Sequence, residues 1–473
     1  MADSIFEKTT LKKIYEEIRT VYLSDNRPWI IGFSGGKDST CMVQLVWSAL
    51  SELPAKKLQK KIYVISSDTL VESPKIVNRI TSSLEKIYNA GKDTNMNIST
   101  NLLRPEISQT FWVSLLGLGY PAPTTMFRWC TDRLKIRNAD RFIRDKVSEY
   151  GEAIVLLGTR KNESGSRQQL MNLYEIKNSY LSRHSKFAQT YVYTPLRDFT
   201  KDDVWNYLLQ NKNPWGDENR DLLALYQEAD ANECPLVVDT STPSCGNGRF
   251  GCWTCTVVEN DKVMVNLIES GNEWMETLSE LRAELKKTQD HDERLKVREI
   301  KRRTGRVELF TDGTDRHTPG PYTLKFCKDY LEKLLKGQVK VQKEGPDPNM
   351  KLILDEEIHE IQRIWRMERG DWQNTAYQIY KKVTGNNLEE IKEDLGGFGK
   401  TEQDLLKQVC KEHDVPSLLV SKLLNAEFEI QGTSRHSKIF GNITKILSEE
   451  WRDDLNVIVK DLAKKRKEKE KVM

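Results

Sequence analysis

The sequence predicts an α/β protein, with a parallel sheet covered by helices on both faces and followed by an α-helical C-terminal region. Two observations lead to this prediction. In the first half of the chain, short apolar runs typical of buried strands alternate with longer segments of helical periodicity. Beyond about residue 260 the strand signals fade, and charged amphipathic patterns typical of helices replace them.

The N-terminal elements follow one another closely. Apolar residues recur at helical spacing over 5–24, and the apolar run 28–33 predicts a buried strand. A turn of small residues at 34–36 leads into a helix over 39–50. The same alternation then predicts a strand over 61–66 and a helix over 74–88.

The later elements extend the pattern and then change it. We expect a helix over about 130–149, a strand over 153–157, and a helix over 200–208 that begins with the capping residue Thr200. A long charged helix is predicted over 271–303, and several more helices over 322–473. The expected regions are an ATP-binding α/β domain at 1–233, a cysteine-cluster and linking region at 234–340, and a helical region at 341–473.

Composition excludes several classes of protein. The 473 residues are 38% hydrophobic and 30% charged, which suits a sizeable core and excludes a small disulfide scaffold. No apolar stretch approaches the roughly 18 residues of a membrane-spanning helix, and the charged N-terminus resembles no export signal, so we expect a cytoplasmic protein with no membrane partner. The net charge of +3 is too small to attract a polyanion unless cations gather locally.

The turn after the first strand carries the strongest functional signal. Its sequence, Ser-Gly-Gly-Lys-Asp-Ser at 34–39, lies between a strand and a helix, where backbone N–H groups and the helix N-terminus can face one anion. A Walker A loop is excluded, because Asp38 stands where Ser or Thr is required and Ile31 where the first glycine is required. The alternative is an ordinary glycine-rich turn.

This segment closely resembles the signature of the PP-loop ATP pyrophosphatase superfamily. The resemblance implies an adenine nucleotide α-hydrolase-like fold and ATP cleavage to AMP and pyrophosphate, with pyrophosphate held by Ser34, Gly35, Gly36, Lys37 and Ser39. It also implies catalytic roles for Lys37 and Asp38. Asp68, at the end of the second strand, lies where the superfamily meets the nucleoside.

Two further segments extend the resemblance. Residues 128–135 place three cations and Cys130 around a helix start, and are similar to a segment of phosphoadenylylsulfate reductases. Residues 158–167, after the third strand, match the pattern with which the superfamily contacts phosphates, which implies nucleotide contacts by Gly158, Arg160 and Arg167 and a catalytic role for Arg160. Arginine can bind phosphate through two hydrogen bonds. The alternative is that these are ordinary surface arginines.

A cysteine cluster suggests a metal site. Cys245, Cys252 and Cys255 stand in a glycine-rich segment with the spacing C-x6-C-x2-C, and closed thiolate sites usually hold four ligands. Cys130 is our choice for the fourth ligand, with Cys234 as the alternative. Spacing alone does not distinguish a zinc site from a [4Fe–4S] cluster. The alternative to either site is three unrelated buried thiols. Cys41, Cys327 and Cys410 are expected to be core residues.

Together, these motifs resemble DndC, the sulfurtransferase family of bacterial DNA phosphorothioation, over residues 1 to about 330. The resemblance implies a [4Fe–4S] cluster on Cys130, Cys245, Cys252 and Cys255, and insertion of sulfur into the DNA backbone after activation by ATP. It also implies DNA, a cysteine desulfurase and further phosphorothioation subunits as partners. Mg²⁺ is expected with ATP, with Asp38 or Asp68 as its carboxylate.

Several alternatives stay open. They are a PP-loop enzyme of tRNA thiolation, a phosphoadenylylsulfate reductase, and a non-catalytic, ATP-regulated Fe–S subunit that binds DNA. DNA contacts are expected from the basic segment at 128–137 or from the Lys-rich stretch at 464–471. The helices after residue 341 carry no ligand spacing, so their use is expected to be packing or contact with partners.

Overall fold

A computed structural model describes residues 4–163, 165–229, 251–388, 398–428, 437–452 and 454–472. The chain divides into two compact units, of which the first comprises Met1–Glu106 with Pro123–Met275 and the second Ile107–Ala122 with Glu276–Met473. The boundary between Met275 and Glu276 falls inside the region that we expected at 234–340. The expected boundary at 233/234 lies outside the described residues.

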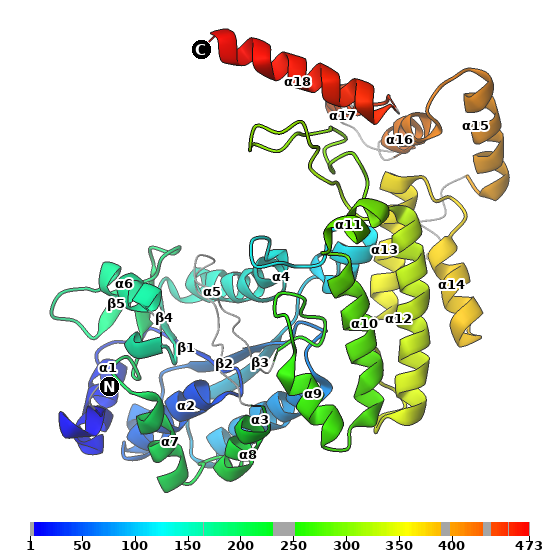
Figure 1. Cartoon of the computed structure of the whole chain (residues 1–473). Helices are drawn as coiled ribbons and strands as arrows, with labels where there is room; N and C mark the ends of the chain where they lie inside the picture. The colour runs from blue at the N-terminus through cyan, green and yellow to red at the C-terminus, as the bar shows by residue number, and fades with distance from the viewer. Residues whose placement is uncertain are drawn as a thin grey trace. The chain divides into compact units, whose positions relative to one another are not determined.

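The first unit is built on a six-stranded sheet (Figure 1). Its strand order is β3-β2-β1-β4-β6-β5, and every neighbouring pair is parallel except β5 with β6. The strands are β1 (Trp29–Gly32), β2 (Ile62–Ser67), β3 (Ile98–Leu103), β4 (Ala153–Leu156), β5 (Leu181–Arg183) and β6 (Thr190–Tyr193). The predicted α/β fold with a parallel sheet is confirmed, and the antiparallel edge strand β5 is an addition to it.

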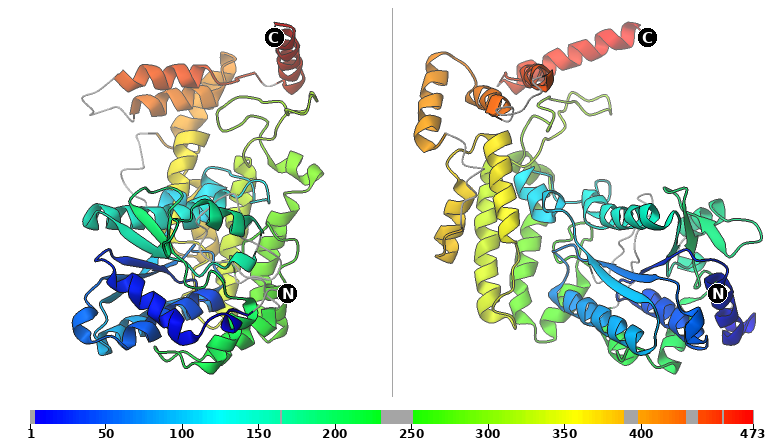
Figure 2. Two further views of the ribbon diagram at one scale, coloured as in Figure 1. Left: turned by 90° about the vertical axis from the view of Figure 1, so that its left-hand side faces the viewer. Right: turned by 180° about the vertical axis from the view of Figure 1, so that it is seen from behind.

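Helices cover both faces of this sheet because the central strands are apolar on both sides. Ile30, Ile65 and Val155 form a buried cluster with Ile143 of α5 (Arg137–Tyr150). Successive strand residues point to opposite faces, so Ile31 and its partners on the adjacent strands, Val64 and Leu156, face the other layer. Figures 1 and 2 show α2 (Lys37–Ser51) and α3 (Pro74–Asp93) on that side. The unit also contains α1 (Leu11–Leu23), α4 (Trp129–Thr131), α6 (Gly165–Leu173), α7 (Lys201–Gln210), α8 (Asn219–Ala229) and α9 (Lys262–Glu269).

Local signals placed several helix ends correctly. The Thr200 hydroxyl accepts a hydrogen bond from the Asp203 backbone N–H at 3.1 Å, and the Asp203 carboxylate accepts one from the Thr200 N–H at 2.8 Å. This capping box starts α7 where it was predicted. The edge strands β3 and β5, and β6 next to β5, were not predicted, because they are partly exposed and lack a continuous apolar run.

The second unit is helical. It contains α10 (Glu276–Lys287), α11 (His291–Val297), α12 (Leu324–Glu344), α13 (Asp355–Arg369), α14 (Thr375–Thr384), α15 (Lys400–Glu412), α16 (Ser417–Phe428), α17 (Ser437–Leu447) and α18 (Leu455–Val472). Figure 2 shows α12 and α13 side by side. The Trp112 indole donates to the Leu352 carbonyl and the Trp365 indole to the Leu116 carbonyl, both at 2.7 Å. These bonds explain why residues 107–122 belong to this unit.

The long helix predicted over 271–303 is wrong. It is interrupted after α10, where the Thr288 hydroxyl donates to the Leu285 carbonyl at 2.6 Å and α11 starts afresh beyond the N-cap Asp290. A side chain that bonds the backbone in this way competes with the helical pattern. In the described part of the chain, no helix combines the length and the apolar character needed to cross a membrane.

Candidate active site

The predicted phosphate loop is a closed turn between β1 and α2. Gly35 has φ = +71°, a left-handed conformation that favours glycine, and Gly36 is the N-cap of α2. The Ser34 N–H donates to the Ser39 hydroxyl at 3.2 Å, and that hydroxyl donates to the Gly36 carbonyl at 3.0 Å. The turn therefore presents the N-terminus of a 15-residue helix at the carboxyl end of β1.

The loop lies where the strand order reverses. From β1 the chain continues outward through β2 and β3, and then returns to place β4 on the other side of β1. Open α/β sheets bind their ligands at this point. A Cβ on Gly158, just after β4, would lie 3.0 Å from the Asp38 carbonyl oxygen. Glycine is therefore required for the two turns to approach this closely.

Three buried charges meet at this point. The Lys37 ammonium lies 3.1 Å from one Asp38 carboxylate oxygen, and the Arg160 Nε donates to the other at 2.6 Å. Lys37 is 2% exposed and Arg160 is 6% exposed. Burial lowers the pKa of Lys37, and Asp38 partly opposes that effect. The three predicted catalytic residues are therefore brought together as a triad with one net positive charge.

Tyr226 of α8 completes this cluster, and the sequence did not indicate it. Its hydroxyl accepts a hydrogen bond from the Lys37 N–H at 3.3 Å, and the Lys37 ammonium lies 5.6 Å from its ring centre. A Cβ on Gly36 would lie 2.9 Å from the Tyr226 oxygen. A single tyrosine in an amphipathic helix carries no sequence signal, so only the packing of α8 reveals it.

Arg167 lies near the triad but has its own partner. It forms an ion pair with Glu163, one helical turn earlier. Burial raises the pKa of Glu163, and Arg167 opposes that shift. The predicted contact between Arg167 and phosphate stays a prediction, since it requires this pair to open.

The carboxyl end of β2 carries polar groups beside the loop. One Asp68 oxygen accepts from the Leu70 N–H at 2.9 Å, and the other from the Arg104 Nε at 3.0 Å. Asp68 is buried, whereas the Arg104 side chain is 61% exposed. The buried hydroxyl oxygens of Ser66 and Ser67 have no hydrogen-bond partner among the described residues. Such groups suit a polar ligand at this strand end.

The cysteine segment lies against the turn that follows β2. The Trp253 N–H donates to the Val71 carbonyl at 3.0 Å, and Cys252 and Glu72 form a β-bridge. The Cys252 sulfur lies 3.4 Å from the Thr69 hydroxyl. Burial, and secondly Glu72, raises the pKa of the Cys252 thiol well above its ordinary value. The structure thus places this thiol beside Thr69, which is two residues beyond the end of β2.

The segment that carries Cys130 reaches the same turn. Lys135, five residues after Cys130, forms an ion pair with Glu72 at 3.0 Å. The Thr256 hydroxyl donates to the Pro123 carbonyl at 2.8 Å. The two cysteine-bearing segments therefore share a border although they are more than 100 residues apart in sequence.

Three of the four cysteines predicted to bind a metal, Cys130, Cys252 and Cys255, lie among the described residues. The Cys255 N–H donates to the Cys252 carbonyl at 3.0 Å, so these two residues lie in one tight turn. Among the described residues, no group of three or more His, Cys, Asp or Glu side chains is arranged to hold a metal ion, and Cys130 does not complete one. Cys245 and Cys234 lie outside the described residues. Cys41, Cys327 and Cys410 are buried, which confirms the expectation that they are core thiols.

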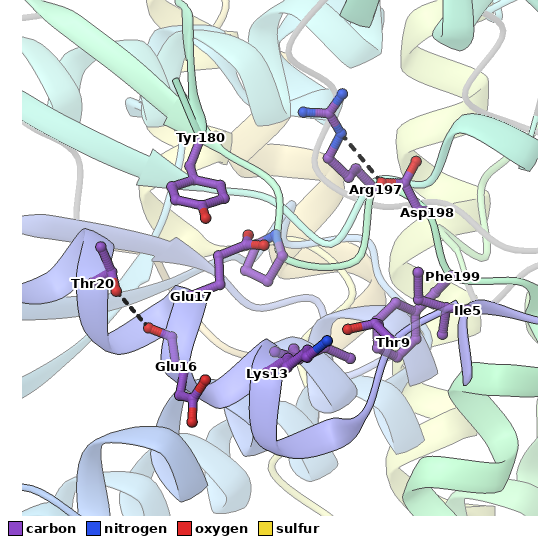
Figure 3. A pocket seen from close by; sticks show the side chains of 12 residues that line it. Ile5, Thr9, Lys13, Glu16, Glu17, Thr20, Tyr180, Arg197, Asp198 and Phe199 are labelled. Carbon is purple, nitrogen blue, oxygen red and sulfur yellow. Dashed lines mark hydrogen bonds and ion pairs between the residues drawn. The ribbon is translucent and has the colours of Figure 1, made fainter. Parts of the chain in front are cut away.

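A separate cavity of about 500 Å³ lies between α1 and the segment after β6 (Figure 3). Glu17 faces it and accepts a hydrogen bond from the Tyr193 hydroxyl at 2.9 Å, and burial raises the pKa of Glu17. The Arg197 carbonyl accepts from the Lys161 N–H at 2.9 Å, which joins one wall to the Arg160 turn. None of the described residues that we predicted for the site lines this cavity.

Comparison with known proteins bears mainly on the first unit. Residues 28–258 match the family model of the phosphoadenosine phosphosulfate reductase domain. An uncharacterized protein of Methanocaldococcus jannaschii is 24% identical over 249 residues, which is 53% of this chain. The match spans only 39% of the length of that relative.

Two solved structures show weak likeness. One is an FMN adenylyltransferase mutant of Candida glabrata, with 13% identity, 50% of this chain and 60% of that chain covered, and a TM-score of 0.26. The other is the U34-tRNA thiolase NcsA of Methanococcus maripaludis with its [4Fe-4S] cluster, which is 13% identical in sequence. The match covers 46% of this chain and 73% of that chain, with a TM-score of 0.28. Both scores are too low to bear on the function of this chain.

The family match agrees with the geometry of the loop. The matched residues contain the phosphate loop, the Arg160 turn and the Cys252 turn, which the sheet brings to one edge. The match covers slightly less than half of the chain, and it supports an ATP-using enzyme with a phosphoadenosine phosphosulfate reductase-like region related to the PP-loop superfamily.

Proposed function

We propose that this protein is an ATP-dependent sulfurtransferase that converts a DNA backbone phosphate into a phosphorothioate. The observation that carries the proposal is the buried triad of Lys37, Asp38 and Arg160 at the switch point, with the Cys252 turn beside the neighbouring strand end. Two cations and a helix N-terminus suit the phosphates of ATP. A thiol-bearing turn at the same edge suits sulfur chemistry.

The proposed reaction has two displacements. A non-bridging oxygen of the DNA phosphate attacks the α-phosphorus of ATP, and pyrophosphate leaves with the electron pair of the broken P–O bond. A partner cysteine desulfurase supplies sulfur as a persulfide, and a thiol reductant cleaves its S–S bond to release sulfide. The sulfide then attacks the DNA phosphorus, and AMP leaves with the oxygen. Adenylation is needed because an unactivated phosphate oxygen is a poor leaving group.

The residues of the triad divide this work. Lys37 and Arg160 offset the charge that develops on the departing pyrophosphate. Asp38 holds both cations in place before ATP binds. The Tyr226 hydroxyl fixes the start of α2 through the Lys37 N–H, so the loop is already shaped for phosphate.

Asp68 is the better candidate for Mg²⁺. Both Asp38 oxygens bind buried cations, and breaking a buried pair costs about 3–5 kcal/mol. Asp68 also has a cationic partner, but Arg104 is exposed, and exposed ion pairs contribute at most about 1 kcal/mol. A cation bound with ATP can therefore replace Arg104 more easily.

We further propose a [4Fe–4S] cluster on Cys130, Cys245, Cys252 and Cys255. The spacing of the cysteines and the border shared by the Cys130 and Cys252 segments support it. The described residues do not by themselves form a metal site, so no step above depends on a cluster. Anaerobically purified protein should be brown and contain roughly four irons. Colourless protein with one zinc would contradict this.

The deciding experiment measures pyrophosphate release from ATP with duplex DNA, with tRNA and without an acceptor. We expect DNA-dependent release, lost in Lys37→Ala and Ser34→Ala but kept in Lys56→Ala, which removes an exposed lysine away from the loop. Release with tRNA alone would assign the chain to tRNA thiolation. No release with either acceptor would favour a non-catalytic subunit.

A further inference from the structure

A long excursion in the second unit carries exposed positive charge. Residues 298–322 run out from α11 and back to α12, and Figure 1 shows them reaching toward α18. The two arms are tied together by the Arg302 N–H, which donates to the Arg306 carbonyl at 2.7 Å, and by the pairing of Leu309 with His317. Gly313, with φ = +84°, forms the turn at the tip. Residues 298–322 thus form a two-armed ribbon whose arms are joined by backbone contacts.

The C-terminal segments lie against this ribbon. Arg466 of α18 donates to the Phe310 carbonyl at 3.3 Å, close to the tip. Nearer the base, the Glu450 N–H donates to the Gly305 carbonyl at 2.8 Å. Two stretches more than 100 residues apart in sequence therefore form one surface, which we name the basic ribbon surface: residues 298–322 together with α18.

This surface concentrates the positive charge of the chain. Residues 298–322 contain six Arg and Lys against four Asp and Glu, and residues 455–472 contain seven against three. The surface is therefore more positive than the whole chain, which has a net charge of +3. The remainder of the chain is slightly negative, so the charge that could attract a polyanion lies here.

Part of this charge is available to a ligand. Among the described residues of the basic ribbon surface, the exposed cations that form no ion pair with a carboxylate include Arg306, Lys464, Lys465 and Lys467. Arg302 and Arg316 do pair with carboxylates, at 3.5 and 3.0 Å, but at exposed sites where such pairs contribute little. A phosphate can replace those partners at low cost.

The spacing of the cations suits an extended polyanion. Lys460, Lys464 and Lys467 stand at intervals of four and three residues, which places them along one face of α18. The 18 residues of α18 extend for about 27 Å at the rise of an α-helix, and a turn of B-DNA extends for about 34 Å. A helix with a cationic ribbon beside it can follow most of one turn of the duplex.

We infer that the basic ribbon surface binds the phosphate backbone of double-stranded DNA. The inference rests on the proposed function for the choice of DNA as the polyanion. It places DNA binding in the helical unit, on a surface that includes the Lys-rich stretch at 464–471, and not at 128–137, the other segment for which the sequence predicted DNA contacts. Two cations of that segment are engaged locally, since Lys135 pairs with Glu72 and Arg137 with Asp132.

The test is the salt dependence of DNA binding, measured by fluorescence anisotropy with a labelled 25-base-pair duplex between 50 and 200 mM salt. The variant replaces four exposed cations by glutamine: Arg306, Lys464, Lys465 and Lys467. Each lost phosphate contact should reduce the slope of log affinity against log salt by about 0.9, so we expect a reduction of up to about 3.6. At 50 mM salt, binding should weaken at least about tenfold.

The matched control removes the same charge from exposed lysines of the first unit: Lys12, Lys56, Lys57 and Lys212. It should keep the wild-type slope. An unchanged slope in the ribbon variant, or an equal loss in the control, overturns the inference, and so does tighter binding of duplex RNA than of duplex DNA.

Pyrophosphate release separates this outcome from failure of the proposed function. If the ribbon variant still releases pyrophosphate at saturating DNA but needs more DNA to do so, both proposals are supported. If wild-type release does not depend on DNA while the slope still falls in the ribbon variant, only the proposed function fails. If release depends on DNA and the slope does not change, only the ribbon surface fails.

Discussion

Asp38→Asn tests the buried triad most directly. Lys37 and Arg160, 2% and 6% exposed, share this one carboxylate at 3.1 and 2.6 Å. The amide leaves two buried cations beside each other without a counter-charge. Removing one partner of a buried ion pair costs about 3–5 kcal/mol, and here two cations lose their partner.

The expected change can be read from thermal unfolding. For a domain of 150–250 residues, about 1 kcal/mol lowers the unfolding midpoint by about 2–4 °C, so we expect a fall on the order of 10 °C. ATP should raise the midpoint more in the variant than in the wild type, because its phosphates replace the missing negative charge. Differential scanning calorimetry with and without ATP measures both effects.

The pH dependence has a definite sign. Burial already lowers the pKa of Lys37 below its ordinary value of 10.5, and loss of Asp38 lowers it further. The penalty for burying charged Lys37 is complete below the folded pKa and disappears as the pH rises through the folded pKa toward the unfolded one. The stability deficit of Asp38→Asn should therefore shrink as the solution is made more alkaline.

Two further variants serve as controls. Lys37→Met added to Asp38→Asn should recover part of the loss, because only one unpaired cation remains. Glu149→Gln, which removes the exposed carboxylate that pairs with Lys146, should leave the midpoint unchanged. If Asp38→Asn unfolds within about 2 °C of the wild type, or if the double variant is less stable than the single one, our account of the triad is refuted.

Three other predictions concern packing, titration and metal content. Gly158→Ala would place a Cβ 3.0 Å from the backbone of α2, so it should destabilise the protein by about 1–3 kcal/mol. It should also weaken ATP binding, as measured by calorimetry. Gly165→Ala, with open space around it, should have neither effect. Burial raises the pKa of Glu357 to about 7, so the contribution of Glu357 to stability should fall as the pH rises from about 4.5 to about 7. A Glu357→Gln variant with the same pH profile of unfolding as the wild type would contradict this. Cys252→Ser should remove iron and Cys410→Ser should not, as measured by iron analysis of anaerobic protein, and equal iron in both would exclude Cys252 as a ligand.

Local sequence determined much of the fold and the centre of the site. The loop at 34–39 was predictable because a strand, a glycine turn and a helix start follow one another without interruption, and the capping box of Thr200 and Asp203 is complete within four residues. The central strands were predictable because burial on both faces requires apolar runs. Signals of this kind need no partner elsewhere in the chain.

Tertiary structure decided what depends on distant partners. The edge strands are polar enough to resemble loops until a neighbouring strand supplies hydrogen bonds. Residues 107–122 belong to the helical unit because Trp112 and Trp365 bond to backbone in segments remote in sequence. Tyr226 reaches Lys37 across 189 positions, and Cys252 reaches Thr69 across 183. Such contacts leave no periodic trace in the sequence, because their energy comes from burial and pairing after the chain has folded.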